Sequence, residues 1–435
     1  MALSDYFTDP VLQAPTLASI LMCLSSALIG VIVFLRKRSL VGEALCHATY
    51  PGVVLSALFC SFFFSPSSDA VLFGALTGAF CTALLGLFII AKLESRFSVK
   101  EDTALCFVIA LFFGVGVLLA SRIQFTQVLW YKAVQLFLYG QAATMVDLHV
   151  TIYTILAVVM VASLSLFFHS IRMVMFDRLF SKSVGVSCRF IEGLLAVLLA
   201  LAIVIGIRSV GVDLLSGMLI APAVAARQLT HGLKSVFFYA ASIGAISGFL
   251  GNYFSTEIPN WLADRGKFSL PTGPMILLSS VVLCLIALLF APENGLLSRL
   301  MRIRRFKKRC DEENVLKSLW KQEVEKVNPS RQGSLKSHFF LLHRLERQGW
   351  IQKRKNGEVV LTKDGQLKAG RIVRLHRLWE AYLVFLGQGI EKVHRSAEEM
   401  EHILTPDLEK QLSELLGDPR KDPHAQPIPS EDEIL

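Results

Sequence analysis

Long apolar runs separated by short polar segments fill the first two thirds of the chain. About nine of them approach the roughly 20 residues that cross the hydrocarbon core of a bilayer. They lie at 15–35, 41–64, 70–91, 102–120, 148–168, 190–207, 210–226, 235–254 and 271–291. A further stretch, 128–139, is shorter and more polar and is not counted. The pattern predicts a polytopic α-helical membrane domain over 1–292, whose first span is retained because no basic residues precede it.

The rest of the chain has the mixed pattern of a soluble domain. Helices are predicted over Asp311–Val327, Leu335–Gln348, Arg371–Phe385 and Lys392–Leu404. Between the second and third, Gly349 ends a helix, and two β-rich runs are joined through Asn356-Gly357, a strong hairpin signal. A helix, a glycine and a hairpin are typical of a winged helix–turn–helix. The chain is therefore expected to be mostly α, with a winged helix–turn–helix over 310–370 and a helical domain over 371–435.

Charge adds an orientation to this pattern. The chain is 53% hydrophobic with a formal net charge of +9, and seven Lys or Arg fall in Arg299–Arg309 without an acid. Twelve basic residues fall in one set of loops between the predicted spans and five in the other, which predicts an external N-terminus and a cytosolic C-terminal domain. The basic cluster, in a predicted linker over 293–309, is either a simple anchor that contacts anionic lipid or an exposed joint between two functional parts. The expected location is a cytoplasmic membrane that the chain crosses several times.

The soluble part divides by charge as well. From Cys310 to Leu378 there are 15 Lys or Arg and 8 Asp or Glu, whereas Trp379 to Leu435 has 5 and 13. This suggests an anionic polymer as the partner of the first segment and cations for the second. The eight cysteines form no CxxC pair, which argues against a zinc ribbon or a disulfide framework.

Glu43 and His47 are four residues apart, so on a helix they share one face. Ionisable groups within spans are usually functional, and a carboxylate with an imidazole can hold a divalent ion. The alternative is a charged helix end with a buried, hydrogen-bonded histidine.

Three segments resemble the ABC-type manganese, zinc and iron permeases: GEALCHATYPGV from Gly42, FDRLFSKSVGVS from Phe176, and VGVDLLSGMLIAPAVAARQL from Val210. The resemblance implies a channel made of two copies, a separate ATPase, and an extracytoplasmic metal-binding protein. It places Glu43 and His47 near the metal path, and Phe176, Asp177 and Gly185 in the segment that couples to the ATPase. The chain has no G-x-x-x-x-G-K-[ST] motif, so ATP binding is assigned to the partner, and no enzyme activity is expected.

Basic residues gather on the predicted winged helix–turn–helix. Those at the hairpin tip would contact phosphate, and those on the second helix would face the groove of operator DNA. The residues at the tip are Lys353, Arg354 and Lys355, and those on the helix are Lys336, His338 and Arg344 together with the polar Ser337. The alternative is a solvated basic surface.

Histidines and glutamates recur at helical spacing on the last two predicted helices. On each helix they can lie along one face, and together they form a nitrogen and oxygen site suited to Fe²⁺ or Mn²⁺. They are His376 and Glu380 on the first helix, and His394, Glu398, Glu401 and His402 on the second. Taken singly, such acid–base pairs are mostly exposed ion pairs on a helix surface.

Residues 374–383, 392–412 and 417–429 resemble the DtxR/MntR family of metal-dependent repressors. The resemblance implies dimerisation, metal corepression and operator binding. It implies one metal site at Glu398, Glu401 and His402, and a paired site around His376, Glu380 and His394. Asn314 and Lys317 stand where the family has further ligands, and the helix–turn–helix before Gly349 is shorter than the family's.

The sequence as a whole predicts the permease of an iron or manganese importer fused to a metal-dependent repressor, and resembles such fusions in intracellular bacteria. A repressor tethered to the membrane cannot reach its operator freely, so we expect cleavage near Arg299–Cys310. The alternative is a cytosolic metal sensor that gates transport and does not bind DNA.

Overall fold

The computed structural model describes residues 4–63, 69–126, 128–261, 269–326, 339–354, 358–389, 393–394, 397–398, 400–403 and 405–430. The chain divides into two compact units, Met1–Arg299 and Leu300–Leu435. Both are mostly helical, as predicted.

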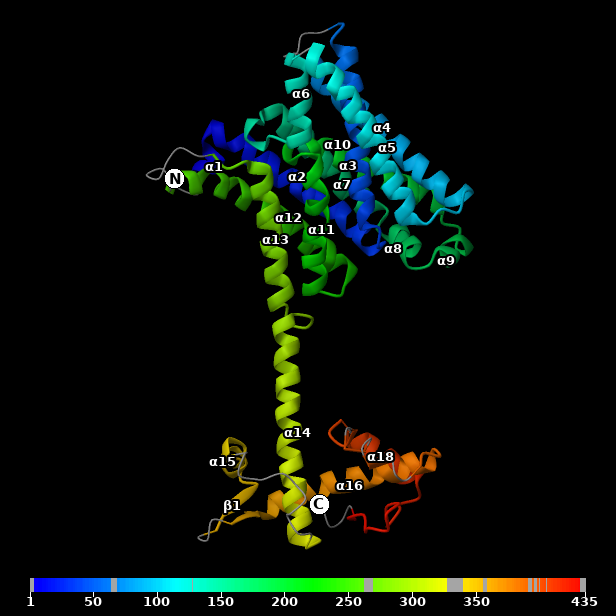
Figure 1. Ribbon diagram of the computed structural model, residues 1–435, viewed down its shortest axis with the longest axis vertical. Coiled ribbons are helices and arrows are strands. Elements are labelled where there is room, and N and C mark those ends of the chain that lie inside the picture. Colours follow the sequence, from blue (N-terminus) through cyan, green and yellow to red (C-terminus); the bar gives the residue numbers. More distant parts are fainter. Residues whose placement is uncertain are drawn as a thin grey trace. The chain divides into compact units, whose positions relative to one another are not determined.

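The first unit is all helical in its described part (Figure 1). Its elements are α1 (Asp5–Thr8), α2 (Pro10–Leu35), α3 (Ser39–Cys60), α4 (Asp69–Arg96), α5 (Glu101–Thr126), α6 (Val128–Tyr139), the 3-10 turn η1 (Ala142–Thr144), α7 (Asp147–Leu166), α8 (Phe168–Phe176), α9 (Arg178–Ser183), α10 (Cys188–Val210), α11 (Val212–Leu229), α12 (Leu233–Trp261) and α13 (Thr272–Phe290).

The number of spans needs correction. Within the described residues, seven helices are long and apolar enough to cross a membrane: α2, α4, α5, α7, α10, α12 and α13. The predicted spans at 41–64 and 210–226 are also helical, as α3 and α11, but α3 is not among the seven and the apolar part of α11, Leu214–Leu229, is shorter. Both helices pack inside the unit, where neighbouring helices replace lipid as their surroundings.

The first unit is built on close contacts between helices. α2 packs against α7, α11 and α12, while α3 packs against α4 and α5. Where α3 crosses α4, a Cβ atom on Gly52 would lie 2.2 Å from the carbonyl oxygen of Gly78. Small residues of this kind let helix backbones approach in a membrane protein.

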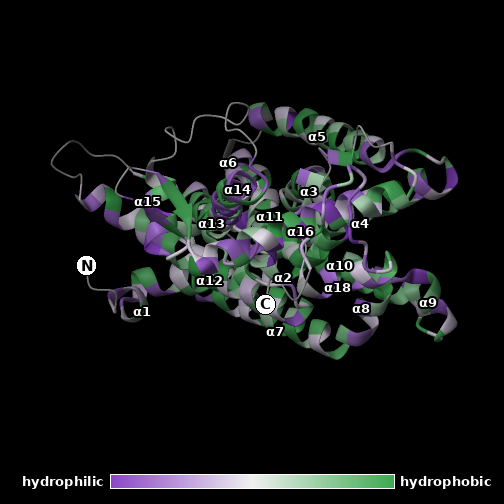
Figure 2. Cartoon of the chain, turned by 90° about the horizontal axis from the view of Figure 1, so that it is seen from below, coloured by the Kyte–Doolittle hydropathy of each residue, from purple (hydrophilic) through white to green (hydrophobic). Residues whose placement is uncertain are grey.

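Large apolar side chains remain exposed on the outside of the unit. On α5 they include Phe107, Leu111 and Leu118, and Figure 2 shows the apolar character of this helix. An exposed apolar surface of this extent suits contact with lipid tails and not with water.

The second unit contains α14 (Leu296–Val324, which begins just before the boundary), α15 (Phe339–Arg347), β1 (Ile351–Lys353), β2 (Val359–Leu361), α16 (Lys363–Phe385) and α18 (Pro406–Leu415). β1 and β2 form the predicted antiparallel hairpin, with Ile351 opposite Leu361. A small core joins α14, α15, the hairpin and α16, and Leu316, Leu345 and Ile351 are among its most buried residues.

A complete winged helix–turn–helix, which the sequence predicts, is not seen in the described part of this unit. The predicted first helix is the last part of the longer α14, which also contains the basic cluster Arg299–Arg309 in helical form. Residues 327–338, where the turn and the start of the reading helix are predicted, lie outside the described residues. What remains of the motif is α15 followed by the hairpin.

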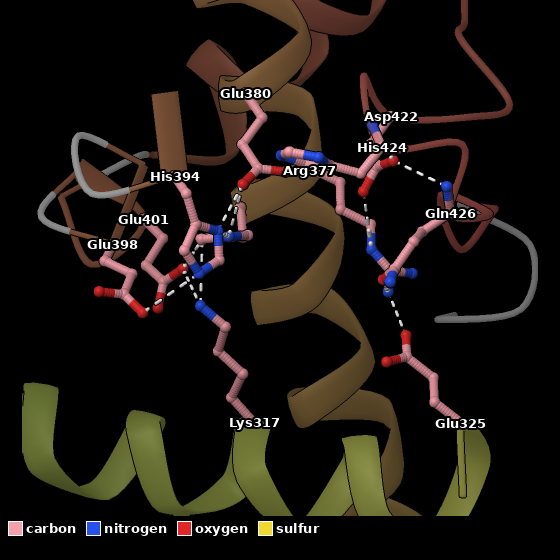
Figure 3. Close-up of polar contacts among 11 residues, drawn as sticks. Lys317, Glu325, Arg377, Glu380, His394, Glu398, Glu401, Asp422, His424 and Gln426 are labelled. Atoms are coloured by element: carbon pink, nitrogen blue, oxygen red, sulfur yellow. Dashed lines mark hydrogen bonds and ion pairs between the residues drawn. The ribbon is translucent and has the colours of Figure 1, made fainter. Parts of the chain in front are cut away.

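The C-terminal segment is tied to α16 by a buried guanidinium. Arg377 is 2% exposed and contacts Glu325 at the end of α14, the backbone oxygen of Pro427, Gln426 at 2.7 Å and Asp422 at 3.5 Å (Figure 3). These contacts fix the face of α16 that lies away from its histidine and glutamate pair.

Candidate metal centre

Helix α16 presents two of the predicted ligands on one buried face. Thr362 caps the helix by accepting a hydrogen bond from the backbone of Gly365. His376 and Glu380 follow one turn apart and are 3% and 2% exposed. The helix therefore delivers an imidazole and a carboxylate to the same enclosed space, as their spacing predicts.

His394 completes a group of three ligand atoms. Its Nδ1 lies 2.7 Å from Glu380 Oε1 and 3.1 Å from His376 Nε2, and His376 Nε2 lies 3.1 Å from the same Glu380 oxygen. All three atoms fall within 4.8 Å of one another. Figure 3 shows Glu380 and His394 pointing toward each other. This is the arrangement from which a single divalent ion can be bound.

The charges of this group are mutually dependent. Burial raises the pKa of Glu380, but hydrogen bonds from His376 and His394 outweigh it and lower the pKa to about 2. Burial lowers the pKa of His376, but its contacts with Glu380 and Glu401 raise it above the ordinary value overall. A carboxylate that stays ionised and attracts protons to its neighbours is also one that attracts a cation.

Glu401 lies behind His376 and is held by a lysine. Its Oε2 is 2.5 Å from His376 Nδ1 and 2.7 Å from the ammonium of Lys317 on α14. The side chains of Glu401 and Lys317 are both buried, being 0% and 8% exposed. Burial raises the pKa of Glu401, yet the hydrogen bond from His376 and the charge of Lys317 lower it overall. A carboxylate that receives the Nδ1 proton leaves Nε2 of the histidine free to bind a metal.

His402 and Glu398 occupy different positions. His402 Nδ1 lies 2.6 Å from Glu313 Oε2 on α14, and Arg309 binds the other oxygen of Glu313 at 2.8 Å. Glu398 is exposed and lies 3.6 Å from His394 Nε2. The six predicted ligands thus lie in one region, but only His376, Glu380 and His394 converge among the described residues.

The donor chemistry of this group fits a divalent transition ion. Two imidazoles and a carboxylate suit Mn²⁺, Fe²⁺ or Zn²⁺, and no thiolate is part of the group. Lys317 and Glu313 were not predicted as partners of the cluster. Their signal was present, because they are one turn apart beside the apolar residues Val315, Leu316 and Leu319 of an amphipathic helix.

In the first unit, Glu43 and His47 lie on α3, one turn apart and half-buried. The ring of His47 meets Phe113 edge to face at 5.0 Å. Its Nδ1 is buried and has no hydrogen-bond partner among the described residues. An unsatisfied imidazole nitrogen in an apolar setting is able to bind a cation or a water molecule.

The predicted coupling segment is an exposed helical turn. Asp177 caps α9 by accepting hydrogen bonds from the backbone of Leu179 and Phe180 at 2.8 and 2.9 Å. Phe176, Leu179 and Phe180 are exposed, and Gly185 has a φ of +85°. A capped helix with an apolar outer surface is suited to docking on another protein.

The described residues of the predicted DNA surface are paired with acids. Arg344 contacts Glu312 at 3.1 Å, Lys353 contacts Glu346 at 3.5 Å, and Arg354 contacts Glu358 at 3.6 Å. Lys336, Ser337, His338 and Lys355 lie outside the described residues.

Two protein families match the chain. Residues 8–291 match the ABC 3 transport family, and residues 362–430 match the metal binding and dimerisation domain of iron dependent repressors.

Individual proteins match over the same regions. A probable metal transport system membrane protein of Chlamydia trachomatis is 35% identical and is covered over 98% of both chains. The manganese transport system membrane protein MntC of Bacillus subtilis is 33% identical over 84% of this chain and 82% of its own. Among solved structures, PsaBC of Streptococcus pneumoniae in complex with Fab matches with a TM-score of 0.57 and 26% identity, over 69% of this chain and 98% of that one.

Proposed function

The chain belongs to the ABC 3 transport family, and from this premise we propose that it imports Fe²⁺ or Mn²⁺ and senses the imported ion with its own C-terminal unit. It is a non-catalytic, multi-pass membrane permease of an ABC importer for divalent metal ions. Importers of this family combine the permease with an ATPase and a substrate-binding protein. Its C-terminal unit carries a metal-binding and dimerisation domain of the iron dependent repressor type.

The convergence of His376, Glu380 and His394 carries the sensing proposal. Two of the three side chains are buried, and Glu401 Oε2 lies 2.5 Å from Nδ1 of His376, where accepting the Nδ1 proton would leave Nε2 to the metal. Nitrogen and oxygen donors favour Fe²⁺ or Mn²⁺ as both cargo and sensed ion, and the relative from Bacillus subtilis is named as a manganese transporter.

The permease part of the proposal rests on α3 and α9. Glu43 and His47 would line the metal path, with a second copy of the chain completing the channel. Phe176, Asp177 and Gly185 would dock on the ATPase at the cytosolic face, where the basic cluster Arg299–Arg309 would contact anionic lipid. The N-terminus would then lie outside.

The C-terminal unit would act on transport directly and reduce uptake when the cytosol is replete. The pairing of Arg344, Lys353 and Arg354 with acids supports this, because a paired guanidinium or ammonium has less charge to offer a phosphate.

Operator binding is the second candidate, favoured by the hairpin of β1 and β2 after α15. In that case the unit would be a repressor, released by cleavage near Arg299–Cys310. A C-terminal tag in the native host distinguishes a released fragment from an intact chain.

The test uses the full chain with its ATPase in liposomes, with the substrate-binding protein outside and Mn²⁺ or a chelator loaded inside. We expect internal Mn²⁺ to slow uptake, Glu380→Gln to abolish this effect, and Glu414→Gln, an exposed change on α18, to retain it. An uptake rate that is the same with and without internal Mn²⁺, together with metal-dependent binding of DNA from upstream of the gene, would favour the repressor. Mn²⁺ binding by the C-terminal unit that survives Glu380→Gln would contradict the metal centre.

A further inference from the structure

The described part of the second unit holds a buried lysine among the histidines and glutamates of the candidate metal centre. The ammonium of Lys317 lies 2.7 Å from Glu401 Oε2 and 3.0 Å from His376 Nδ1. Its side chain is 8% exposed. A buried ammonium needs a counter-charge, and Glu401 supplies it.

Two further donor atoms lie next to each other on this side, among the residues that the structure describes. Within that part of the chain, Glu401 Oε1 is buried without a hydrogen-bond partner, and His402 Nε2 lies 3.6 Å away from it. The other nitrogen of His402 is engaged by Glu313. One carboxylate oxygen and one imidazole nitrogen can attract a cation, but two donor atoms are too few to bind a divalent ion firmly. The Lys317 ammonium already neutralises the same carboxylate.

We propose that the Lys317 ammonium takes the place of a second divalent ion, so that each chain binds one such ion in this unit, at His376, Glu380 and His394. The inference rests on the proposed function, in which that group of three binds the sensed metal. The lysine repels a dication from Glu401 through its charge and fixes the carboxylate that orients His376.

The charge reversal Lys317→Glu follows directly from this geometry. It removes the ammonium and adds a carboxylate beside Glu401 Oε1 and His402 Nε2, giving three donors of the kind that bind Mn²⁺. Lys321→Glu is the matched control, because it makes the same change in charge one turn further along α14.

The experiment titrates metal-free full-length protein in detergent with Mn²⁺ and follows the free and bound ion by electron paramagnetic resonance. In the wild type we expect one bound ion that Glu380→Gln removes, with the spectrum of an isolated ion. In Lys317→Glu we expect one additional ion and the spectrum of two magnetically coupled ions. Lys321→Glu should match the wild type.

Each other outcome has a definite meaning. A coupled pair in the wild type would overturn the inference, even if Lys317→Glu does not fold, while leaving metal sensing in place. A folded Lys317→Glu that binds its first ion but gains no second would overturn it as well. A wild type without an ion sensitive to Glu380→Gln would overturn the proposed function itself.

Discussion

The buried pair of Lys317 and Glu401 allows a quantitative test of how the metal centre is held in its metal-free state. The two charges are 2.7 Å apart, with side chains 8% and 0% exposed. Removing one partner of such a pair costs about 3–5 kcal/mol, because the other charge stays buried without compensation. Since a domain is stable by only about 5–15 kcal/mol, the loss is large.

We therefore expect Lys317→Met and Glu401→Gln each to lower the free energy of opening of α16 by about 3–5 kcal/mol. The double variant should lose much less than the sum, because neither charge is then left alone. Hydrogen exchange of α16 in the metal-free full chain measures the opening, and protection should fall by roughly two to four decades in each single variant.

These variants form a double-mutant cycle, and a second cycle with Arg371→Met and Glu409→Gln serves as the control. Their ion pair is 3.0 Å long and also joins α16 to another segment of the unit, but Arg371 is 44% exposed. A coupling of about 0.2–1 kcal/mol is expected for such a pair. Additive effects of Lys317→Met and Glu401→Gln, or a coupling no larger than that of the control cycle, would refute the assignment of Glu401 to the lysine.

Three further outcomes are expected. In the metal-free chain, protection of α16 from hydrogen exchange should be greater near pH 6 than near pH 8. The pKa of His376 is raised in the folded state, so the stability that its protonation adds is fully present below the unfolded value of 6.5 and is lost as pH rises through the folded pKa. Saturating Mn²⁺ should reverse this trend, because the ion binds the neutral imidazole. Gly52→Ala should lower the melting temperature of the detergent-solubilised protein, because its Cβ would lie 2.2 Å from the Gly78 oxygen. Gly114→Ala should not, because no atom of the described residues lies within 4 Å of the added carbon. Asp177→Ala should destabilise α9 by about 1 kcal/mol and reduce metal-stimulated ATP hydrolysis by the assembled transporter while Mn²⁺ binding to the C-terminal unit is unchanged.

Hydropathy predicted where the helices of the first unit lie, but not how many are long and apolar enough to cross a membrane. The difference concerns α3 and α11. α3 carries Glu43 and His47 and is largely buried among other helices, so its surroundings are protein on most sides. Burial does not decide the count, because α2 is 72% buried in its apolar window and is among the seven. The seven meet a criterion of length and apolar composition, which α3, with its polar residues Glu43 and His47, and the shorter apolar part of α11 do not meet.

The i,i+4 spacing of His376 and Glu380 predicts that they share one face of a helix, and in the structure their ligand atoms lie within 4.8 Å of one another and of His394. Their use as metal ligands stays a prediction. The partners of Glu401 could not be predicted in the same way. Whether Glu401 faces a metal or Lys317 depends on how α14 packs against the rest of the unit, which is a contact between residues 84 positions apart. The periodicity of a single helix does not predict which residues far apart in the sequence come into contact.

The basic cluster shows a different limit of sequence reasoning. Seven basic residues in Arg299–Arg309 predict an exposed linker but no particular secondary structure, and the structure places them on α14 with the side chains exposed. Lys and Arg are good helix formers, and an exposed helix needs no apolar stripe where it makes no contacts. A charge run therefore predicts exposure well and secondary structure poorly.

The number of ions per chain also bounds how sharply the sensor can respond. The cooperativity of binding, expressed as a Hill coefficient, cannot exceed the number of coupled sites. We propose two chains as the coupled set, because the C-terminal unit matches a metal binding and dimerisation domain. With Lys317 in place of a second ion, a pair of chains holds two ions there, and the Hill coefficient for Mn²⁺ occupancy of this unit should be no higher than about 2. Lys317→Glu raises the limit to about 4. A wild-type coefficient clearly above 2, measured as the part of Mn²⁺ binding that Glu380→Gln removes, would mean that more than one ion per chain contributes and that the lysine does not replace a metal.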